Sequence, residues 1–153
     1  MKIQKILDVK GSIEVCTILA TATLTELVAQ VSDRNIGALL VTDEKGSIVG
    51  IVSERDVVHQ CHKNMAFDTI TVGDIMTQNV VTAHPEDDSS IAVELMVSKN
   101  IRHLPVISEG EIHGLITVRD LIHAMREADK DEVDKLVEYL QNSIVERECV
   151  VGD

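Results

Sequence analysis

The sequence predicts a mixed α/β (α+β) fold built from two β-α-β-β-α repeats. The main observation is a seven-residue segment, here called the signature, that occurs twice, as Gly50–Asp56 and as Gly114–Asp120. Each copy has a glycine, two aliphatic residues, Ser or Thr, one variable residue, Arg and Asp. Segments before the signature match at an offset of 65 residues, and the signatures match at 64. Units this small bury their own faces poorly, so we expect the two repeats to pack on each other with approximate two-fold symmetry.

Hydrophobic periodicity and capping residues place the elements of the first repeat. Ile3, Ile6 and Leu7 recur at helical spacing, and Gly11 stands where that helix would end. Thr23 and Glu26 form a capping-box pattern at the start of an amphipathic helix. The expected elements, in order, are a helix at 1–9, a strand at 15–18, a helix at 23–35, strands at 36–42 and 47–52, and a helix from 53 through 61.

The same order is expected again after a polar connector at 63–68. The expected elements are a short helical turn at 71–76, a brief strand at 80–82, a helix opened by 84–88, a strand at 100–106 and the second signature with its helix. We therefore divide the chain into an N-terminal helix (1–10), a first repeat (11–68), a second repeat (69–126) and a C-terminal helix and tail (127–153).

The segment 129–148 is charged apart from one apolar stripe. Its members are Val133, Leu136, Val137, Leu140 and Ile144. Such a stripe predicts an amphipathic helix. We expect it either to cover the N-terminal helix of the same chain or to contact a second subunit.

Composition and charge exclude several classes of protein. The chain has 153 residues and is 44% hydrophobic, but it has no long apolar run and no secretory signal pattern, so we expect a soluble cytoplasmic protein without a membrane segment. Its three widely spaced cysteines are expected to be reduced thiols. A net charge of −12 and the near absence of aromatic residues argue against nucleic-acid binding and against anionic lipid surfaces.

The signature has two physical interpretations. Ser53 and Thr117 stand where a strand ends and a helix begins, so each can cap the helix, with Asp56 or Asp120 completing a capping box. The alternative is a ligand site, because helix starts bind anions and a carboxylate accepts hydrogen bonds from vicinal ribose hydroxyls. The pairing of Arg with Asp in two copies favours the ligand site. Any bound phosphate would need a local cluster of cations, for which Arg55, Arg102 and Arg119 are the candidates.

Catalysis and metal binding have little support in the sequence. No nucleophile-elbow, Walker or paired-cysteine motif is present. His59 and His62 stand three residues apart and are a possible metal pair, but no further ligand set accompanies them. We therefore expect no enzyme activity and no bound metal.

The doubled signature, together with Ile101–Val106 (IRHLPV) and a capped helix in each repeat, resembles a tandem pair of cystathionine β-synthase (CBS) domains. The resemblance covers about residues 11 to 126 and is strongest to small stand-alone bacterial proteins made of one such pair. It implies a homodimer of pairs, with two clefts between repeats that bind adenosyl ligands. AMP or NAD is favoured, and ATP, ADP and S-adenosylmethionine are the other candidates.

The resemblance also assigns roles to residues. Asp56 and Asp120 would hold ribose, and Ser53 and Thr117 would bond ribose or phosphate. The other cleft residues would be Ile36, Gly37, Ala38, Ile101, Arg102 and His103, with Cys16, Thr17, Val81 and Thr82 at the adenine edge. Because Gly37 and Ala38 stand where the second repeat has Arg102 and His103, the clefts are expected to differ in affinity. Leu40 stands where the second repeat has Pro105, which we expect to matter little.

Two functions are therefore expected. The first is a regulatory module that senses an adenine nucleotide, changes how its units pack and acts on a separate protein. The alternative is an interaction module with vestigial clefts that docks a partner through its C-terminal helix.

Overall fold

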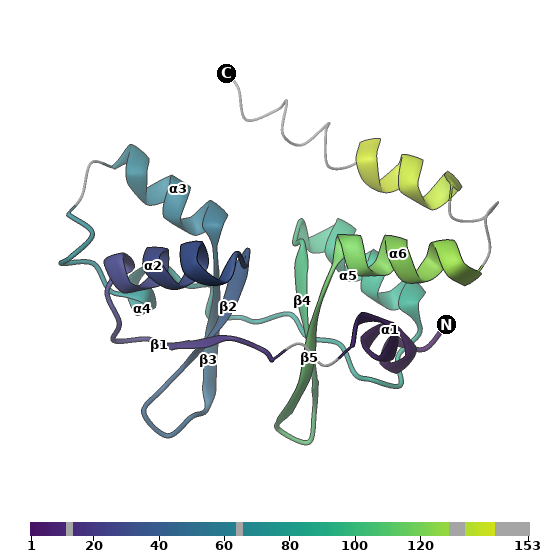
Figure 1. The fold of residues 1–153 in the computed structure, drawn as a ribbon, viewed down its shortest axis with the longest axis horizontal. Coiled ribbons are helices and arrows are strands. Elements are labelled where there is room, and N and C mark those ends of the chain that lie inside the picture. The colour runs from purple at the N-terminus through teal and green to yellow at the C-terminus, as the bar shows by residue number, and fades with distance from the viewer. Residues whose placement is uncertain (12–13, 64–65, 129–133, 143–153) are drawn as a thin grey trace. The chain divides into compact units, whose positions relative to one another are not determined.

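The computed structural model describes the chain except residues 12–13, 64–65, 129–133 and 143–153. The chain divides into two compact units. One unit is Val15–Val80, which holds the first repeat (Figure 1). The other combines Met1–Glu14 with Val81–Asp153, so the N-terminal helix belongs to the unit of the second repeat. The predicted mixed α/β fold with two repeats is confirmed.

The first-repeat unit is a three-stranded sheet with helices. Its elements are β1 (Thr17–Leu19), α2 (Leu24–Arg34), β2 (Ala38–Thr42), β3 (Ile48–Ser53), α3 (Glu54–His62) and α4 (Val72–Ile75). Strand β2 lies in the middle of the sheet, parallel to β1 and antiparallel to β3. All five residues of β2 are buried, as expected for a central strand rich in aliphatic residues. Its core consists of Ile18, Leu27, Leu39, Val41, Val52 and Val72.

The ends of α2 follow from its sequence. Thr23 and Glu26 form both hydrogen bonds of a capping box at the start. Asn35 ends the helix in the left-handed conformation, with φ of 50°. Asn100 ends the corresponding helix of the second repeat in the same way, with φ of 53°. The two helices therefore end alike, whereas at the start of α5 the side chain of Asp88 accepts from the amide of Ser90 in place of a capping box.

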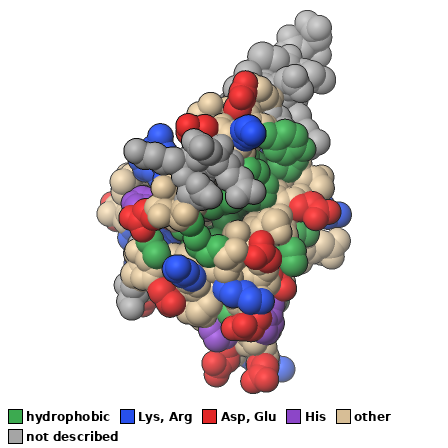
Figure 2. Space-filling model, turned by 90° about the vertical axis from the view of Figure 1, so that its right-hand side faces the viewer, with side chains coloured by type: hydrophobic (Ala, Val, Ile, Leu, Met, Phe, Trp, Pro, Cys, Tyr) green, Lys and Arg blue, Asp and Glu red, His purple; other side chains and the backbone are tan. Residues whose placement is uncertain are grey.

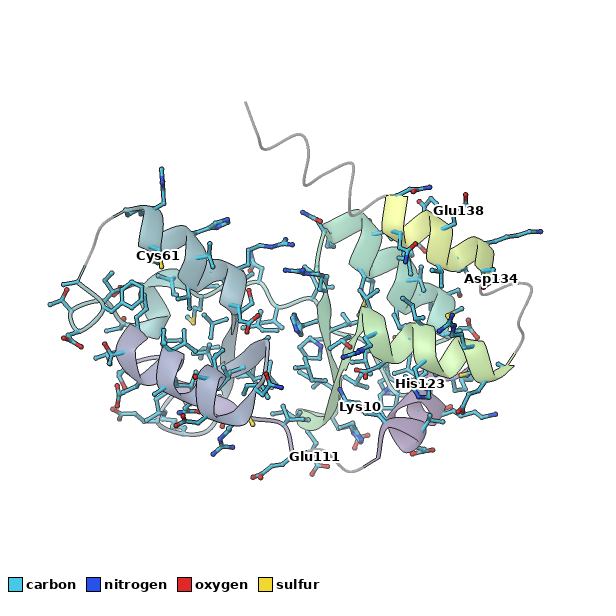
Figure 3. All side chains as sticks on the ribbon, turned by 45° about the horizontal axis from the view of Figure 1, so that its top comes forward. Lys10, Cys61, Glu111, His123, Asp134 and Glu138 are labelled. Atoms are coloured by element: carbon cyan, nitrogen blue, oxygen red, sulfur yellow. The ribbon has the colours of Figure 1, made fainter. Side chains whose placement is uncertain are left out.

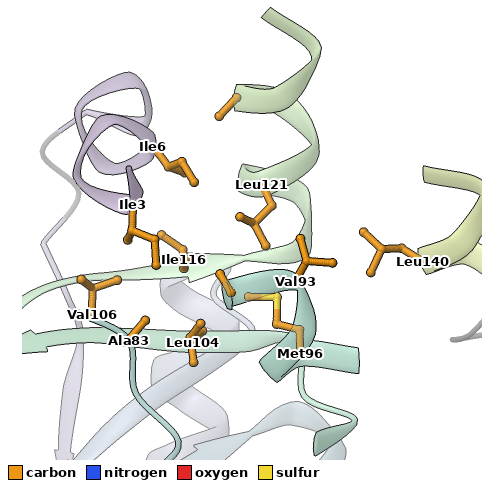
Figure 4. Packing of buried hydrophobic residues seen from close by; sticks show 12 residues of the cluster. Ile3, Ile6, Ala83, Val93, Met96, Leu104, Val106, Ile116, Leu121 and Leu140 are labelled. Atoms are coloured by element: carbon orange, nitrogen blue, oxygen red, sulfur yellow. The ribbon is translucent and has the colours of Figure 1, made fainter. Parts of the chain in front are cut away.

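The second-repeat unit contains α1 (Ile3–Lys10), α5 (Ser89–Lys99), β4 (His103–Ser108), β5 (Glu111–Thr117), α6 (Val118–Ala128) and a helix at 134–142. Strands β4 and β5 pair antiparallel. Figure 4 shows the core that they share with α1, α5 and α6. Ile3, Leu104, Ile116 and Leu121 are fully buried in it.

The predicted strand at 80–82 is wrong. Only Ala83 makes a parallel bridge, to Val106 of β4. In the first repeat the amide of Leu40 donates to the carbonyl oxygen of Cys16 at 3.2 Å and extends β1. Pro105 occupies the matching place in β4 and has no N–H to donate. The replacement of Leu by Pro therefore shortens the pairing to one bridge. Other boundaries shift by about two residues, which is common at element ends.

The C-terminal stripe is described only within 134–142. Leu140 is 3% exposed and belongs to the second-repeat core, where Figure 4 shows it near Val93 of α5. Leu136 packs against the same cluster. This part of the stripe therefore packs on its own chain, whereas Val133 and Ile144 lie outside the described residues. Within the described ranges, no helix is long and apolar enough to cross a membrane.

Candidate functional site

The two signature aspartates are held in the same way at the starts of α3 and α6. Asp56 Oδ2 accepts hydrogen bonds from the amide of Ser53 at 2.8 Å and from its hydroxyl at 3.1 Å. Asp120 Oδ2 accepts from the amide and hydroxyl of Thr117 at 2.8 and 2.9 Å. Both aspartates are half-buried. The predicted capping role is therefore confirmed, and each carboxylate keeps its other oxygen, Oδ1, outside the cap.

The strand that precedes each signature begins beside the same helix start. In the first repeat, Ala38 pairs with Ser53, and the amide of Glu54 donates to the carbonyl oxygen of Gly37 at 3.0 Å. In the second repeat, His103 pairs with Thr117, and the amide of Val118 donates to the carbonyl oxygen of Arg102 at 3.3 Å. Of the predicted site residues, Gly37 and Ala38 thus lie beside the first signature, and Arg102 and His103 lie beside the second. The amides of Ile36 and Ile101 instead bond carbonyl oxygens near the ends of α2 and α5.

The residues expected at the adenine edge lie one strand further away. Thr17 is exposed on β1 and pairs with Leu40, two residues along β2 from Ala38. Cys16 is half-buried, and its sulfur accepts a hydrogen bond from Arg34 at 3.3 Å. In the second repeat, Val81 is half-buried and Thr82 is exposed, just before the bridge at Ala83. Their contact with a ligand stays a prediction.

The signature glycines are required by packing. A Cβ atom on Gly50 would lie 2.5 Å from Met76 Sδ and 2.9 Å from the carbonyl oxygen of Thr77. A Cβ on Gly114 would lie 2.6 Å from Leu7 Cδ2. Each is far inside van der Waals contact, so in both repeats another segment crosses directly over the signature strand.

Cations are distributed unequally between the two signatures. Arg55 is half-buried, and Arg102 and Arg119 are exposed. The second signature has one further cation that sequence reasoning missed: Lys10 Nζ lies 2.7 Å from Asp120 Oδ2. Lys10 is separated from Asp120 by 110 positions. No spacing pattern identifies such a pair.

Capping geometry alone does not define a ligand site in this chain. Thr71 and Asp74 at the start of α4 make the same bonds, because Asp74 Oδ2 accepts from the amide and hydroxyl of Thr71 at 2.9 Å each. These hydrogen bonds, the backbone one first, hold the pKa of the Asp74 carboxyl below its ordinary value. Asp74 is exposed, however, whereas the signature aspartates are half-buried.

Two surface hollows lie on the separate units. One, of about 470 Å³, is lined by Asp56, His59 and His62 among others. The other, of about 680 Å³, lies in the second-repeat unit between α5, α6 and 134–142, away from the signature. Figure 2 shows hydrophobic side chains exposed on that side of the molecule. In the described part of the chain, no group of three or more His, Cys, Asp or Glu residues is placed to hold a metal.

The sequence model of the CBS domain matches this chain twice, at residues 9–63 and 72–127. The chain belongs to the CBS-domain family. Both matches contain a complete signature and the strand start beside it, so the features described above are those of two CBS repeats.

Similar proteins agree with this assignment. The mitochondrial CBS domain-containing protein CBSX3 of Arabidopsis thaliana is 31% identical over 124 residues, which cover 78% of this chain and 60% of that protein. The crystal structure of the CBS-domain protein ATU1752 of Agrobacterium tumefaciens has a TM-score of 0.76 and 30% identity, covering 82% of this chain and 99% of that one. The CBS pair of protein MJ0100, solved with 5′-methylthioadenosine and S-adenosyl-L-methionine, has a TM-score of 0.73 and 25% identity, covering 84% and 98%.

Proposed function

We propose that this protein is a regulatory module that binds an adenosyl ligand at its CBS signatures and acts on a separate protein. The observation that carries the proposal is the half-buried carboxylate at each signature, fixed by its cap and adjacent to the start of a strand. The MJ0100 pair, which was solved with two adenosyl compounds, supports the ligand class. Asp56 and Asp120 bind ribose in this proposal.

The chemistry at each signature suits a ribose with a phosphate attached. Oδ2 is engaged by the cap, and Oδ1 of Asp56 or Asp120 can accept hydrogen bonds from vicinal hydroxyls, which are stronger than neutral ones because the acceptor is charged. The amino end of the helix favours negative charge nearby. Arg102 and Arg119 are exposed close to the second signature and can contact phosphate.

AMP or NAD is the ligand that this proposal favours, because few cations lie near each signature and a triphosphate would require more of them. In this proposal the site at Asp120 is the tighter one, since Lys10 lies beside Asp120 and no described lysine pairs with Asp56. We further propose that the chain acts as a homodimer, and that ligand binding changes how its units pack.

Calorimetric titration with AMP, NAD, ATP and S-adenosylmethionine tests the proposal. We expect at least one of these compounds to bind the full chain. The double variant Asp56→Ala with Asp120→Ala should weaken this binding by about tenfold or more, since a hydrogen bond to a charged group contributes about 1.5–3 kcal/mol. Asp74→Ala is the matched control, because it removes the same cap at α4 and should leave affinity unchanged. Absence of binding at millimolar ligand would overturn the proposal, as would equal effects of the control.

The hollow beside the helix at 134–142 gives the interaction function a specific basis. Leu136 and Tyr139 line this hollow, and Tyr139 is 56% exposed. Tyr139→Ala should abolish the binding of a partner that docks here, whether or not a nucleotide is present. Deletion of residues 129–153 is a poor test, because it also removes the buried Leu140 and would destabilise the second repeat. A pull-down that responds to Tyr139→Ala but not to nucleotide would favour this second function.

A further inference from the structure

Lys10, the last residue of α1, lies at the second signature (Figure 3). Its Nζ donates to the carbonyl oxygen of Leu115 at 2.7 Å and forms an ion pair with Asp120 Oδ2, also at 2.7 Å. Both side chains are 19% exposed, so solvent and salt screen their interaction only in part. The carboxylate expected to bind ribose therefore already has a cation beside it.

The position of Lys10 is fixed by the packing of α1. Ile3 and Ile6 are buried in the second-repeat core, and Leu7 lies against Gly114 of the signature. Gly11 ends the helix with φ of 81°, one residue after Lys10. The ammonium group is consequently held at the signature by the helix that carries it, whereas Lys5, the other lysine of this helix, is exposed.

Both members of the pair keep hydrogen-bonding capacity for a ligand. An ammonium group has three donors, and Nζ uses two of them on Leu115 and Asp120. Among the described residues, none donates to Asp120 Oδ1. In the first repeat, Asp56 Oδ2 receives the bonds from Ser53, and no described lysine pairs with it.

The charges of Lys10 and Asp120 determine which class of ligand the second signature prefers. An isolated carboxylate repels a ligand phosphate a few ångströms away, and the net charge of −12 adds to that repulsion. Lys10 neutralises the carboxylate without removing its acceptor oxygen. We propose that Lys10 is a specificity-determining residue of the second CBS repeat that selects phosphorylated adenosyl compounds over neutral ones. This inference rests on the proposed function, and it concerns a residue outside the signature.

Titrations of the full chain with AMP and with adenosine test the inference. We expect Lys10→Gln to weaken AMP binding by about tenfold, which corresponds to the loss of one partly screened charge contact. The affinity for adenosine should change by less than about twofold. Lys10→Arg retains the charge and should keep the preference for AMP. Lys5→Gln is the matched control, because it removes the same charge from an exposed position of α1. Thermal unfolding shows whether each variant is folded.

The outcomes separate the inference from the proposed function. An unchanged ratio of AMP to adenosine affinity in Lys10→Gln overturns the inference while leaving adenosyl binding in place. Tighter binding of both compounds also overturns it, because Lys10 would then be a competitor for Asp120. If the wild-type chain binds neither compound nor any other adenosyl ligand, the proposed function itself fails.

Discussion

At the scale of single residues, the signature glycine and the signature aspartate serve different purposes. Gly114 allows Leu7 of α1 to lie directly on β5, and Gly50 allows Met76 to lie on β3. Asp120 caps a helix through Oδ2 and keeps Oδ1 outside that cap. The glycines therefore contribute to the stability of each repeat, and substitution of the aspartates tests ligand binding.

Gly114→Ala should destabilise the second repeat by about 1–3 kcal/mol, because the added methyl group overpacks a close contact with Leu7. Urea unfolding followed by circular dichroism measures the loss. Combined with Leu7→Ala, which makes room for the methyl group, Gly114→Ala should cost clearly less than it does alone. Strict additivity of the two substitutions would show that the contact is not the cause.

Glu26 makes stability depend on pH through its capping box. The amide and then the hydroxyl of Thr23 hydrogen-bond the Glu26 carboxylate and lower its pKa from the ordinary 4.5. A lowered folded-state pKa contributes stability that is present above 4.5 and is lost as pH falls through the folded value. Glu26→Gln keeps the capping bonds but does not titrate. Its unfolding free energy should fall less than that of the wild type between neutral and acid pH; parallel curves would contradict this.

At the scale of elements, the effect of Pro105 shows where local patterns stop being informative. The capped helices, the hairpins and the element order were predictable, because caps, turns and hydrophobic periodicity are short-range features. The loss of pairing at 80–82 was not predicted. The Pro105 replacement was visible in the sequence and was expected to matter little, but the N–H that it removes belongs to a strand far along the chain. The contact of Lys10 with Asp120 was not predicted either, because the two residues are 110 positions apart in the sequence.

Pro105→Leu should restore the missing donor. The amide introduced at position 105 is expected to bond the carbonyl oxygen of Val81, as the amide of Leu40 bonds Cys16 in the first repeat. Hydrogen exchange measured by NMR should then show protection at position 105 comparable to that of Leu40. Exchange as fast as in an unstructured segment would mean that another feature prevents the strand.

The helix at 134–142 should contribute to stability through one face only. Leu140→Ala is expected to cost about 2–5 kcal/mol, because it leaves a cavity in the second-repeat core. The neighbouring Tyr139→Ala, at a position that is 56% exposed, should cost much less. Equal losses in denaturant unfolding would contradict the packing described for Leu140.

At the scale of the whole molecule, the two CBS repeats are alike in sequence and unlike in what surrounds them. The second repeat has α1, the helix at 134–142 and Lys10 in its unit, whereas the first has α4 and a hollow beside Asp56. The duplication and the family were visible in the sequence through the repeated signature. The inequality of the repeats was visible only in part, as Gly37 against Arg102, because the ion pair of Lys10 with Asp120 joins residues 110 positions apart.

The most direct test of the account compares AMP with 2′-deoxy-AMP in calorimetric titrations of the wild-type chain and of Asp56→Ala with Asp120→Ala. Recognition of vicinal hydroxyls by the signature carboxylates predicts that the wild type prefers AMP by about tenfold or more, and that the double variant loses this preference. Equal affinity of the wild type for the two nucleotides would contradict it.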